Sequence, residues 1–574
     1  MIRHSAPNLG AAIAATMAAM LPSAATATTI FVNATSDVVA NDGVCTLREA
    51  ITAASTNVAS GPGGECAAGA PLPTVDTIAF AIPGLGVHAI QPSSPLPNIA
   101  EAVLIDGYTQ SGTHANTLAI GDDAVLLIEI DGSLIPGISD LFRLTAPGST
   151  VRGLVVNRVR GVSLLLGADD NVVEGNFLNT DAAGTTHLGG GFTVIRVTAA
   201  NNVIGGTDPA ARNVVGGGGD ANAGTIMIGG NGNLVQGNYI GVDRSGGAPL
   251  QPPAGSNGVE LGTGGAASNT VIGGDTAGAG NVIHATNSAV RLSGNVTATT
   301  IQGNRIGVTA SGSASLGGFV GITTDNGPSG IQIGGLTPTA GNVLSGLSTA
   351  INLVDGATTV IVQGNRIGTD ASGTFPLRNA GDGIFMRTAG ADSLIGGTEP
   401  GAANTIAFNC GQAIRIDAGH WPVLGNSIHS NNGLGVSFFG SSSPIANDPG
   451  DVDTGPNDLQ NYPVITNAVV AGGTATVTGT LNSTPSTTFR LEFFASQACH
   501  PSGFGEGQQY IGTTDVTTDA GGDASFGPLA FAAPENAEIT ATATDPGGNT
   551  SEFSQCAGPH DHLFADGFDV PSCG

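Results

Sequence analysis

Apolar and polar positions along this chain repeat with a period of about 61 residues. A Gly-Asn pair followed after one residue by Ile or Leu recurs along the chain, and five of its copies begin at Gly175, Gly237, Gly303, Gly364 and Gly425. The steps between these glycines are 62, 66, 61 and 61 residues. A nearly constant period of this size predicts stacked copies of one structural unit.

Each period contains a second, similar element. An Ile-Gly-Gly segment lies between successive Gly-Asn pairs and is followed by another asparagine, at Asn213, Asn281, Asn342 and Asn404. Short alternating strands such as residues 350–353 precede both halves. We therefore predict an all-β chain with two coils of about 30 residues per period, forming a parallel β-helix over residues 76–445. Ile and Val would stack inside it, and the asparagines would stack at one corner.

The ends of the predicted solenoid have different patterns. Thr46 and Glu49 have the spacing of a capping box, and Leu47, Ala50, Ile51 and Ala54 fall on one helical face. We expect residues 28–75 to cover the open end of the solenoid with a small helical cap. Residues 446–461 are a link rich in Asp, Gly and Pro, and the alternating strands of residues 462–558 predict an immunoglobulin-like β-sandwich. Residues 559–574 form a tail whose segment 564–569 has no assigned role.

The segment Cys45-Thr-Leu-Arg-Glu-Ala50 resembles the signature of the CSLREA domain family, with Thr46 in place of the family's serine. Residues 76–80 and 105–112 also look like the entry coils of such proteins. The resemblance implies a secreted bacterial right-handed parallel β-helix of the pectin-lyase-like class. It implies no particular activity, because the family has no agreed one.

Composition excludes several classes of function. The net charge of −28 argues against nucleic acid and anionic membranes as partners. All 16 basic residues are Arg, so neither a Schiff-base lysine nor a phosphate-binding P-loop is present. Residues 1–27 resemble a signal peptide, with an apolar run over residues 9–21 and an Ala-Thr-Ala cleavage pattern at residues 25–27. We expect a secreted or cell-surface protein without a transmembrane segment, and a monomer.

Six cysteines would meet an oxidising compartment if the chain is exported. Cys45 with Cys66 and Cys499 with Cys556 are the natural local pairs. Cys410 lies inside a repeat, where we expect a buried free thiol, and the state of Cys573 is left open.

Two groups of residues are candidates for chemistry. Asp169 and Asp170, near Arg158 and Arg160, form a cluster that does not recur, and they are the best candidates for a lyase or hydrolase site. Asp181, Asp243 and Asp370, with Arg305 and Arg366, recur in successive periods. A catalytic site occurs once whereas a structural role repeats, so we interpret this second group as corner residues.

The link contains a candidate Ca²⁺ site made of hard oxygen ligands: Asp448, Asp451, Asp453, Asn457 and Asp458. The alternative is a solvated linker, because Gly455-Pro456 breaks the EF-hand spacing. No other cofactor is expected.

With no unique catalytic constellation, we favour binding or adhesion to a glycan or cell-surface polymer over enzymatic activity. The alternatives are a polysaccharide lyase or glycoside hydrolase, and a purely structural spacer. The recognition surface is expected in the loops that follow the Gly-Asn repeats, over residues 182–191, 244–257, 310–319 and 371–380.

Overall fold

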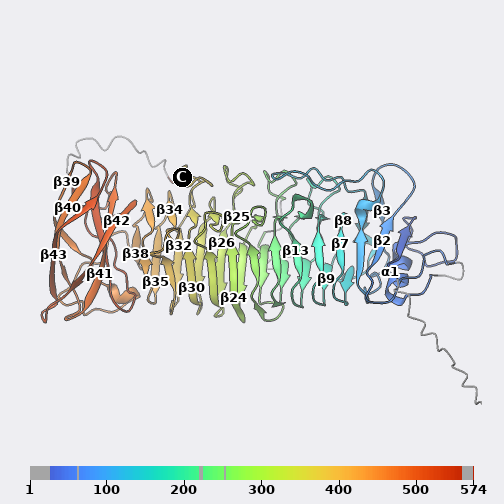
Figure 1. Ribbon diagram of the computed structural model, residues 1–574, viewed down its shortest axis with the longest axis horizontal. Helices are drawn as coiled ribbons and strands as arrows, with labels where there is room; N and C mark the ends of the chain where they lie inside the picture. The colour runs from blue at the N-terminus through green and yellow to red at the C-terminus, as the bar shows by residue number, and fades with distance from the viewer. Residues whose placement is uncertain are drawn as a thin grey trace, which may run out of the picture.

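The computed structural model describes residues 26–60, 64–218, 224–250, 254–388, 390–558 and 573. Residues 1–25 of the predicted signal peptide and the tail segment 564–569 lie outside the described residues. The chain forms a long rod of stacked strands, with helix α1 (Leu47–Thr56) at one end and a β-sandwich at the other (Figure 1). Among the described residues, no helix combines the length and apolar character needed to cross a membrane.

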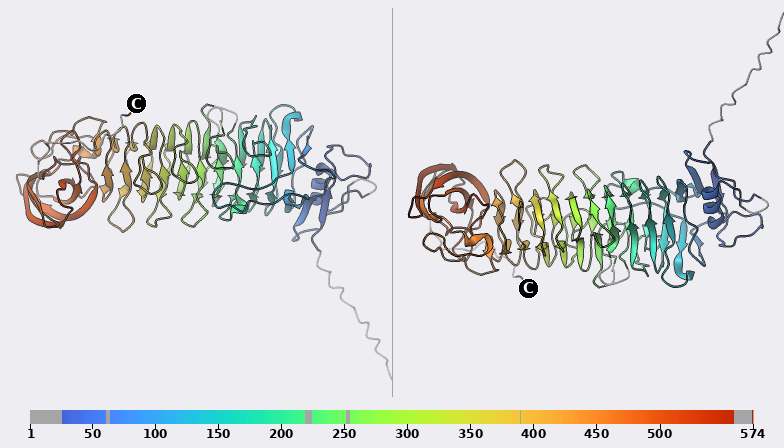
Figure 2. Two further views of the ribbon diagram at one scale, coloured as in Figure 1. Left: turned by 90° about the horizontal axis from the view of Figure 1, so that it is seen from above. Right: turned by 90° about the horizontal axis from the view of Figure 1, so that it is seen from below.

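The rod is a right-handed parallel β-helix, as predicted. It has three sheets, and all strand pairs within them are parallel. Each full coil passes from the first sheet to the second and then to the third, and the sheets line the sides of the rod (Figure 2). We call them sheets 1, 2 and 3.

Sheet 1 comprises β1 (Thr29–Val32), β2 (Asp76–Phe80), β4 (Val103–Asp106), β7 (Thr150–Arg152), β10 (Val172–Glu174), β13 (Val203–Gly205), β17 (Leu234–Gln236), β21 (Val271–Gly273), β24 (Val296–Gln302), β27 (Ser329–Gly334), β30 (Thr358–Gln363), β33 (Leu394–Gly396) and β36 (Val423–Leu424), with β16 (Gly230–Asn231) and β20 (Ala267–Ser268) beside this path. Sheet 2 comprises β3 (His88–Ile90), β5 (Ile128–Asp131), β8 (Leu154–Asn157), β11 (Phe177–Leu178), β14 (Val214–Val215), β18 (Tyr239–Ile240), β22 (Val282–Ile283), β25 (Arg305–Ile306), β28 (Val343–Leu344), β31 (Arg366–Ile367), β34 (Thr405–Ala407) and β37 (Ser427–His429). Sheet 3 comprises β6 (Phe142–Leu144), β9 (Val162–Leu166), β12 (Thr193–Val197), β15 (Gly224–Ile228), β19 (Asn257–Leu261), β23 (Ser288–Ser293), β26 (Val320–Asp325), β29 (Thr349–Val354), β32 (Ile384–Arg387), β35 (Ile414–Ala418) and β38 (Val436–Phe438).

The corner between sheets 1 and 2 explains the repeated Gly-Asn pair. The glycine adopts a left-handed conformation, with φ +67° at Gly364, and a Cβ there would collide with the carbonyl oxygen of Gly335. The asparagine side chains are buried, and each Nδ2 donates to the Oδ1 of the asparagine in the next coil over 2.9–3.1 Å. This ladder comprises Asn176, Asn213, Asn238, Asn281, Asn304, Asn342, Asn365, Asn404 and Asn426. The predicted two coils per period are confirmed, because asparagines of the two kinds alternate along it.

The N-terminal end is covered by α1, as expected. Thr46 is the N-cap, and the reciprocal bonds of a capping box link it to Glu49. The apolar face of the helix is buried in the core of the rod. The disulfide Cys45–Cys66 holds the loop that follows. This cap also extends sheet 1, because β1 pairs with β2.

The C-terminal sandwich packs two antiparallel sheets face to face around their own apolar core. One sheet comprises β39 (Val464–Ala471), β40 (Thr474–Asn482) and β43 (Asp523–Ala532), and the other comprises β42 (Gln509–Thr517), β41 (Thr488–Ser496) and β44 (Glu538–Thr544). The predicted disulfide Cys499–Cys556 is present.

The sandwich closes the last coil with buried acidic side chains. Glu506 accepts hydrogen bonds from the backbone and side chain of Asn431, and so ends a second ladder that starts at Asn379. Glu492 accepts from the backbone N–H of Gly425, and Glu552 accepts from two backbone N–H groups near β38. These carboxyl groups satisfy donors that a further coil would otherwise bind.

The expectation of a free thiol at Cys410 is wrong. Cys410 forms a disulfide with Cys573, 163 residues later in the chain. The pairing could not be read from spacing, because the two cysteines are 163 residues apart in the sequence. No free cysteine remains among the described residues.

Candidate functional site

The predicted catalytic cluster is not assembled. Asp169 and Asp170 lie in the turn between β9 and β10, where Asp169 accepts a hydrogen bond from the backbone of Ala200. Arg158 and Arg160 lie at the other end of β9, in the turn that follows β8. Arg158 forms ion pairs with Asp131, at 3.2 Å, and with a second carboxylate on sheet 2. A five-residue strand therefore separates the two carboxylates from the two arginines.

The recurring aspartates fix loop corners, as predicted. Oδ1 of Asp181 accepts from the backbone N–H groups four and five residues later, and Asp243 and Asp370 repeat this pattern. Burial opposes ionisation of Asp181 and Asp370, but these hydrogen bonds prevail and lower the pKa of both carboxyl groups.

Three of the five predicted Ca²⁺ ligands come together. One carboxylate oxygen from each of Asp448, Asp451 and Asp453 lies within 4.8 Å of the others. Oδ1 of Asp448 and Oδ1 of Asp453 are buried without a hydrogen-bond partner, and burial raises the pKa of Asp451 to about 6. This donor set fits a hard divalent cation.

The other two predicted ligands have structural roles. The Asn457 side chain bonds to the backbone of Trp421 and to the carbonyl oxygen of Thr550. Asp458 accepts from Asn549. Trp421 is completely buried, so it joins the last coil to the link and offers no surface to a sugar.

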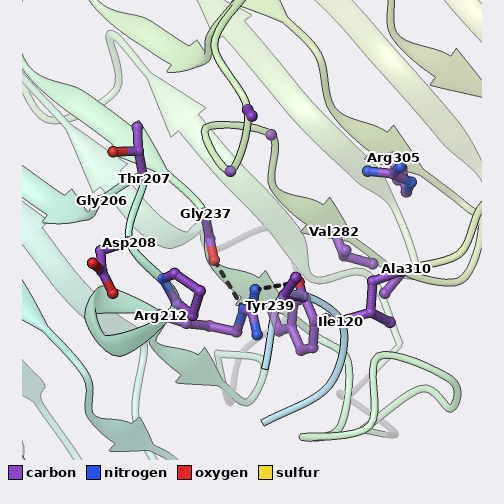
Figure 3. A pocket seen from close by; sticks show the side chains of 15 residues that line it. Ile120, Gly206, Thr207, Asp208, Arg212, Gly237, Tyr239, Val282, Arg305 and Ala310 are labelled. Atoms are coloured by element: carbon purple, nitrogen blue, oxygen red, sulfur yellow. Dashed lines mark hydrogen bonds between the residues drawn. The ribbon is translucent and has the colours of Figure 1, made fainter. Parts of the chain in front are cut away.

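A groove lies over sheet 2. Two adjoining cavities, of about 370 and 310 Å³, share Ala277, Gly278, Gly280 and Arg305. Loops that follow sheet 1 supply one wall, with Gly278 and Gly280, and loops that follow sheet 2 supply Ala310. Ala310 belongs to the loop over residues 310–319, one of the four loops in which we expected the recognition surface. In Figure 3, Asp208 and Arg212 lie on one side of the first cavity, and Arg305 and Ala310 lie on the other.

The floor of the groove is a row of outward-facing side chains in register on successive coils of sheet 2. In order they are Val155, Phe177, Val214, Tyr239, Val282, Arg305, Val343, Arg366, Thr405 and Ser427. The row begins apolar and becomes cationic and polar. Only the fold reveals this row, because its members are 22 to 43 residues apart in the sequence.

Arg305 and Arg366 stand on this floor without partners. Among the described residues, neither guanidinium group forms an ion pair or a side-chain hydrogen bond. Nε of Arg305 is buried and unsatisfied, and burial lowers the pKa of this guanidinium. Their interpretation as corner residues is therefore wrong: they recur, but they face a groove.

A strap formed by residues 116–124 closes the apolar end of the groove. Arg212 donates to the carbonyl oxygens of Leu118, Ala119 and Gly121, and Arg244 donates to those of Asp122 and Ala124. The guanidinium of Arg212 lies 4.5 Å from the centre of the Tyr239 ring, whose hydroxyl accepts from the backbone of the strap. Ala124 and Leu126 pack on the apolar half of the floor.

Sheet 3 carries a charged cluster that sequence reasoning missed. Arg291 forms ion pairs with Glu260, at 3.0 Å, and with Asp325, at 2.5 Å. Glu260 and Arg291 are register partners on neighbouring strands. The cluster occurs once, but Arg291 is paired with both carboxylates, and the Glu260 side chain is only 1% exposed.

No family model matches the chain, and no curated protein matches it. Among solved structures, it is similar to full-length tailspike protein 2 from Escherichia coli O157:H7 bacteriophage CAB120, with 12% identity and a TM-score of 0.25 over 84% of this chain and 64% of the tailspike. It is also similar to a mutant tailspike protein of E. coli bacteriophage HK620, with 10% identity and a TM-score of 0.31 over 82% and 84% of the two chains. For the enzymatically active domain of bacteriophage CBA120 tailspike protein 2, identity is 12% and the TM-score is 0.24 over 85% and 71%. The chain thus spans less than two thirds of the full-length tailspike.

Proposed function

We propose that this chain is a secreted or cell-surface protein that binds a glycan, or a similar extended surface polymer, in the groove over sheet 2. The observation that carries the proposal is the open half of the groove, in which two adjoining cavities follow successive coils along the rod. Their volumes lie in the range of ligand sites, and an extended polymer would contact several coils at once. Both walls are loops, and the floor is rigid sheet, which is the arrangement that preorganised recognition requires.

We also propose a division of the chain into domains. Residues 28–75 would be a CSLREA-type cap, residues 76–445 the β-helix, residues 446–461 the link, and residues 462–558 an immunoglobulin-like module carried at the far end. Three disulfides suit export to an oxidising compartment through the segment 1–27.

A polysaccharide lyase or hydrolase is the alternative. Most glycoside hydrolases use two carboxyl groups that flank the scissile bond. The described lining of the groove contains a single carboxylate, Asp208, and it is exposed. Binding without turnover is therefore the better supported activity.

A glycan array probed with the mature chain tests the proposal directly. We expect retention on extended glycans, with no release of unsaturated products or reducing ends from the same polysaccharides. Absence of retention on every glycan would refute the proposal and favour the structural spacer. Turnover that is lost in Asp170→Asn would instead establish the enzyme.

A further inference from the structure

We propose that the groove selects a polyanionic glycan, whose negative groups are held by Arg305 and Arg366. This inference rests on the proposed function and names the chemical class of its ligand. It starts from two cationic side chains that face a cavity and have no partner in the chain.

The groove is positively charged, whereas the protein as a whole is negatively charged. The chain has 44 acidic and 16 basic residues, so it contains more than enough carboxyl groups to pair with every arginine. Among the described residues, most other arginines of the rod have a partner in the chain, as Arg291 has in Glu260 and Asp325, and the two that have none, Arg160 and Arg196, are exposed. The described lining of the second cavity contains Arg305 and Arg366 and no acidic residue. The open groove is thus a cationic site on an anionic rod, and it favours anionic ligands.

Arg305 has the position of an anchor. It stands on the floor between Gly280 on one wall and Ala310 on the other. Its Nε is buried without an acceptor, and leaving a buried charged donor unsatisfied is costly. A carboxylate or sulfate in the groove would accept charge-assisted hydrogen bonds from the other N–H groups of this guanidinium, with which Arg305 lines the cavities.

The distance between the two arginines along the rod also restricts the ligand. Arg305 pairs in register with Val343, and Val343 pairs with Arg366, so the two guanidinium groups belong to coils two steps apart. At the usual distance between hydrogen-bonded strands, this separation is about 9.6 Å along the rod. Such a spacing suits charges that repeat on the scale of a disaccharide in an extended polymer.

The strap shows how arginines of this groove bind the oxygen atoms of a chain segment. At the closed end of the same groove, Arg212 and Arg244 bind the strap, residues 116–124, through its carbonyl oxygen atoms. Arg305 and Arg366 present the same groups farther along the floor. The strap borders the cavity at Arg305 through Ala119 and Ile120, but no strap residue lines the cavity that contains Arg366. An external chain in that position would take the acceptor role that strap oxygens have at the other end.

The test measures binding of three soluble polymers of equal length by isothermal titration calorimetry. They are an oligoglucuronate, its carboxyl-reduced neutral counterpart, and a sulfated glucan. The variants are Arg305→Gln and Arg366→Gln, and the matched control is Arg196→Gln, because Arg196 is exposed on β12 of sheet 3. Circular dichroism melting of each variant verifies its fold.

We expect the mature chain to bind at least one anionic polymer and to bind the neutral counterpart at least about tenfold more weakly. Arg305→Gln and Arg366→Gln should each weaken anion binding by about tenfold or more, and added salt should do the same, while Arg196→Gln should bind like the parent. The carboxylated and sulfated polymers identify which anion is preferred. Equal binding of the neutral polymer, unchanged in both groove variants, would overturn the inference and leave the proposed function standing. Absence of binding by all three polymers, together with an empty glycan array, would overturn both.

Discussion

Glu506 makes the junction between the rod and the sandwich sensitive to pH. Its carboxyl group is fully buried, and burial raises the pKa of this group from its ordinary value of 4.5 to about 8. The hydrogen bonds from Asn431 oppose this effect but do not cancel it. The group is therefore protonated at neutral pH in the folded chain and ionised in the unfolded chain.

The sign and size of the effect follow from linkage. Because folding raises the pKa of Glu506, the contribution of this group to the free energy of unfolding is highest below pH 4.5. That contribution falls as pH rises towards 8. Over this interval of 3.5 pH units the free energy of unfolding should decrease by about 5 kcal/mol on account of Glu506 alone. Glu552, whose pKa burial raises to about 7, adds a smaller decrease of the same sign.

The change that tests this reasoning is Glu506→Gln, which keeps the shape of the protonated acid and cannot ionise. Urea unfolding at pH 4.5, 6 and 8, followed by fluorescence, reports on the junction because Trp421 is the only tryptophan and lies buried there. We expect the variant to match the parent at pH 4.5 and to exceed it in stability at pH 8. The exposed Glu535 supplies the control Glu535→Gln, which should follow the parent at every pH. If Glu506→Gln shows the same dependence on pH as the parent, the carboxyl group does not titrate as described.

Three further predictions concern the rod and the link. Gly364→Val should lower the melting temperature well beyond Ala183→Val in an exposed loop, because a Cβ at position 364 meets the carbonyl of Gly335 and φ is +67° there; equal shifts would contradict this reason. Asn304→Ala should reduce the free energy of unfolding by about 2–4 kcal/mol, since it interrupts the asparagine ladder and leaves buried groups unpaired; a change below 0.5 kcal/mol would show that the ladder is not stabilising. Chelation should lower the melting temperature and Ca²⁺ should restore it, with Asp451→Asn abolishing the response; no heat in a calorimetric titration with Ca²⁺ would end the metal hypothesis.

Local patterns in the sequence were sufficient for most of the fold. The Gly-Asn corner and the capping box at Thr46 each depend on residues close together in the chain, and both were predicted correctly. The disulfide of Cys410 and the groove were not predictable in this way. The floor of the groove is a register relation between strands of different coils, and in the sequence Arg305 and Arg366 look like any other repeated position.

Repetition was also a poor guide to function at these two positions. Asp181 and Asp370 are repeated and structural, because their side-chain oxygens accept backbone hydrogen bonds. Arg305 is repeated as well, but it is unsatisfied. In a solenoid, repetition itself can build a site for a repetitive ligand, because equivalent side chains on successive coils lie in a line.

Hydrogen–deuterium exchange with and without a bound polyanionic oligosaccharide is the most direct test of the binding groove. We expect slower exchange in the loops over residues 274–282, 303–310 and 335–343, which border the open half of the groove. We expect no change in the strands of sheet 3 or in those of the sandwich. Protection confined to sheet 3 or to the sandwich, with the groove loops unchanged, would contradict this expectation.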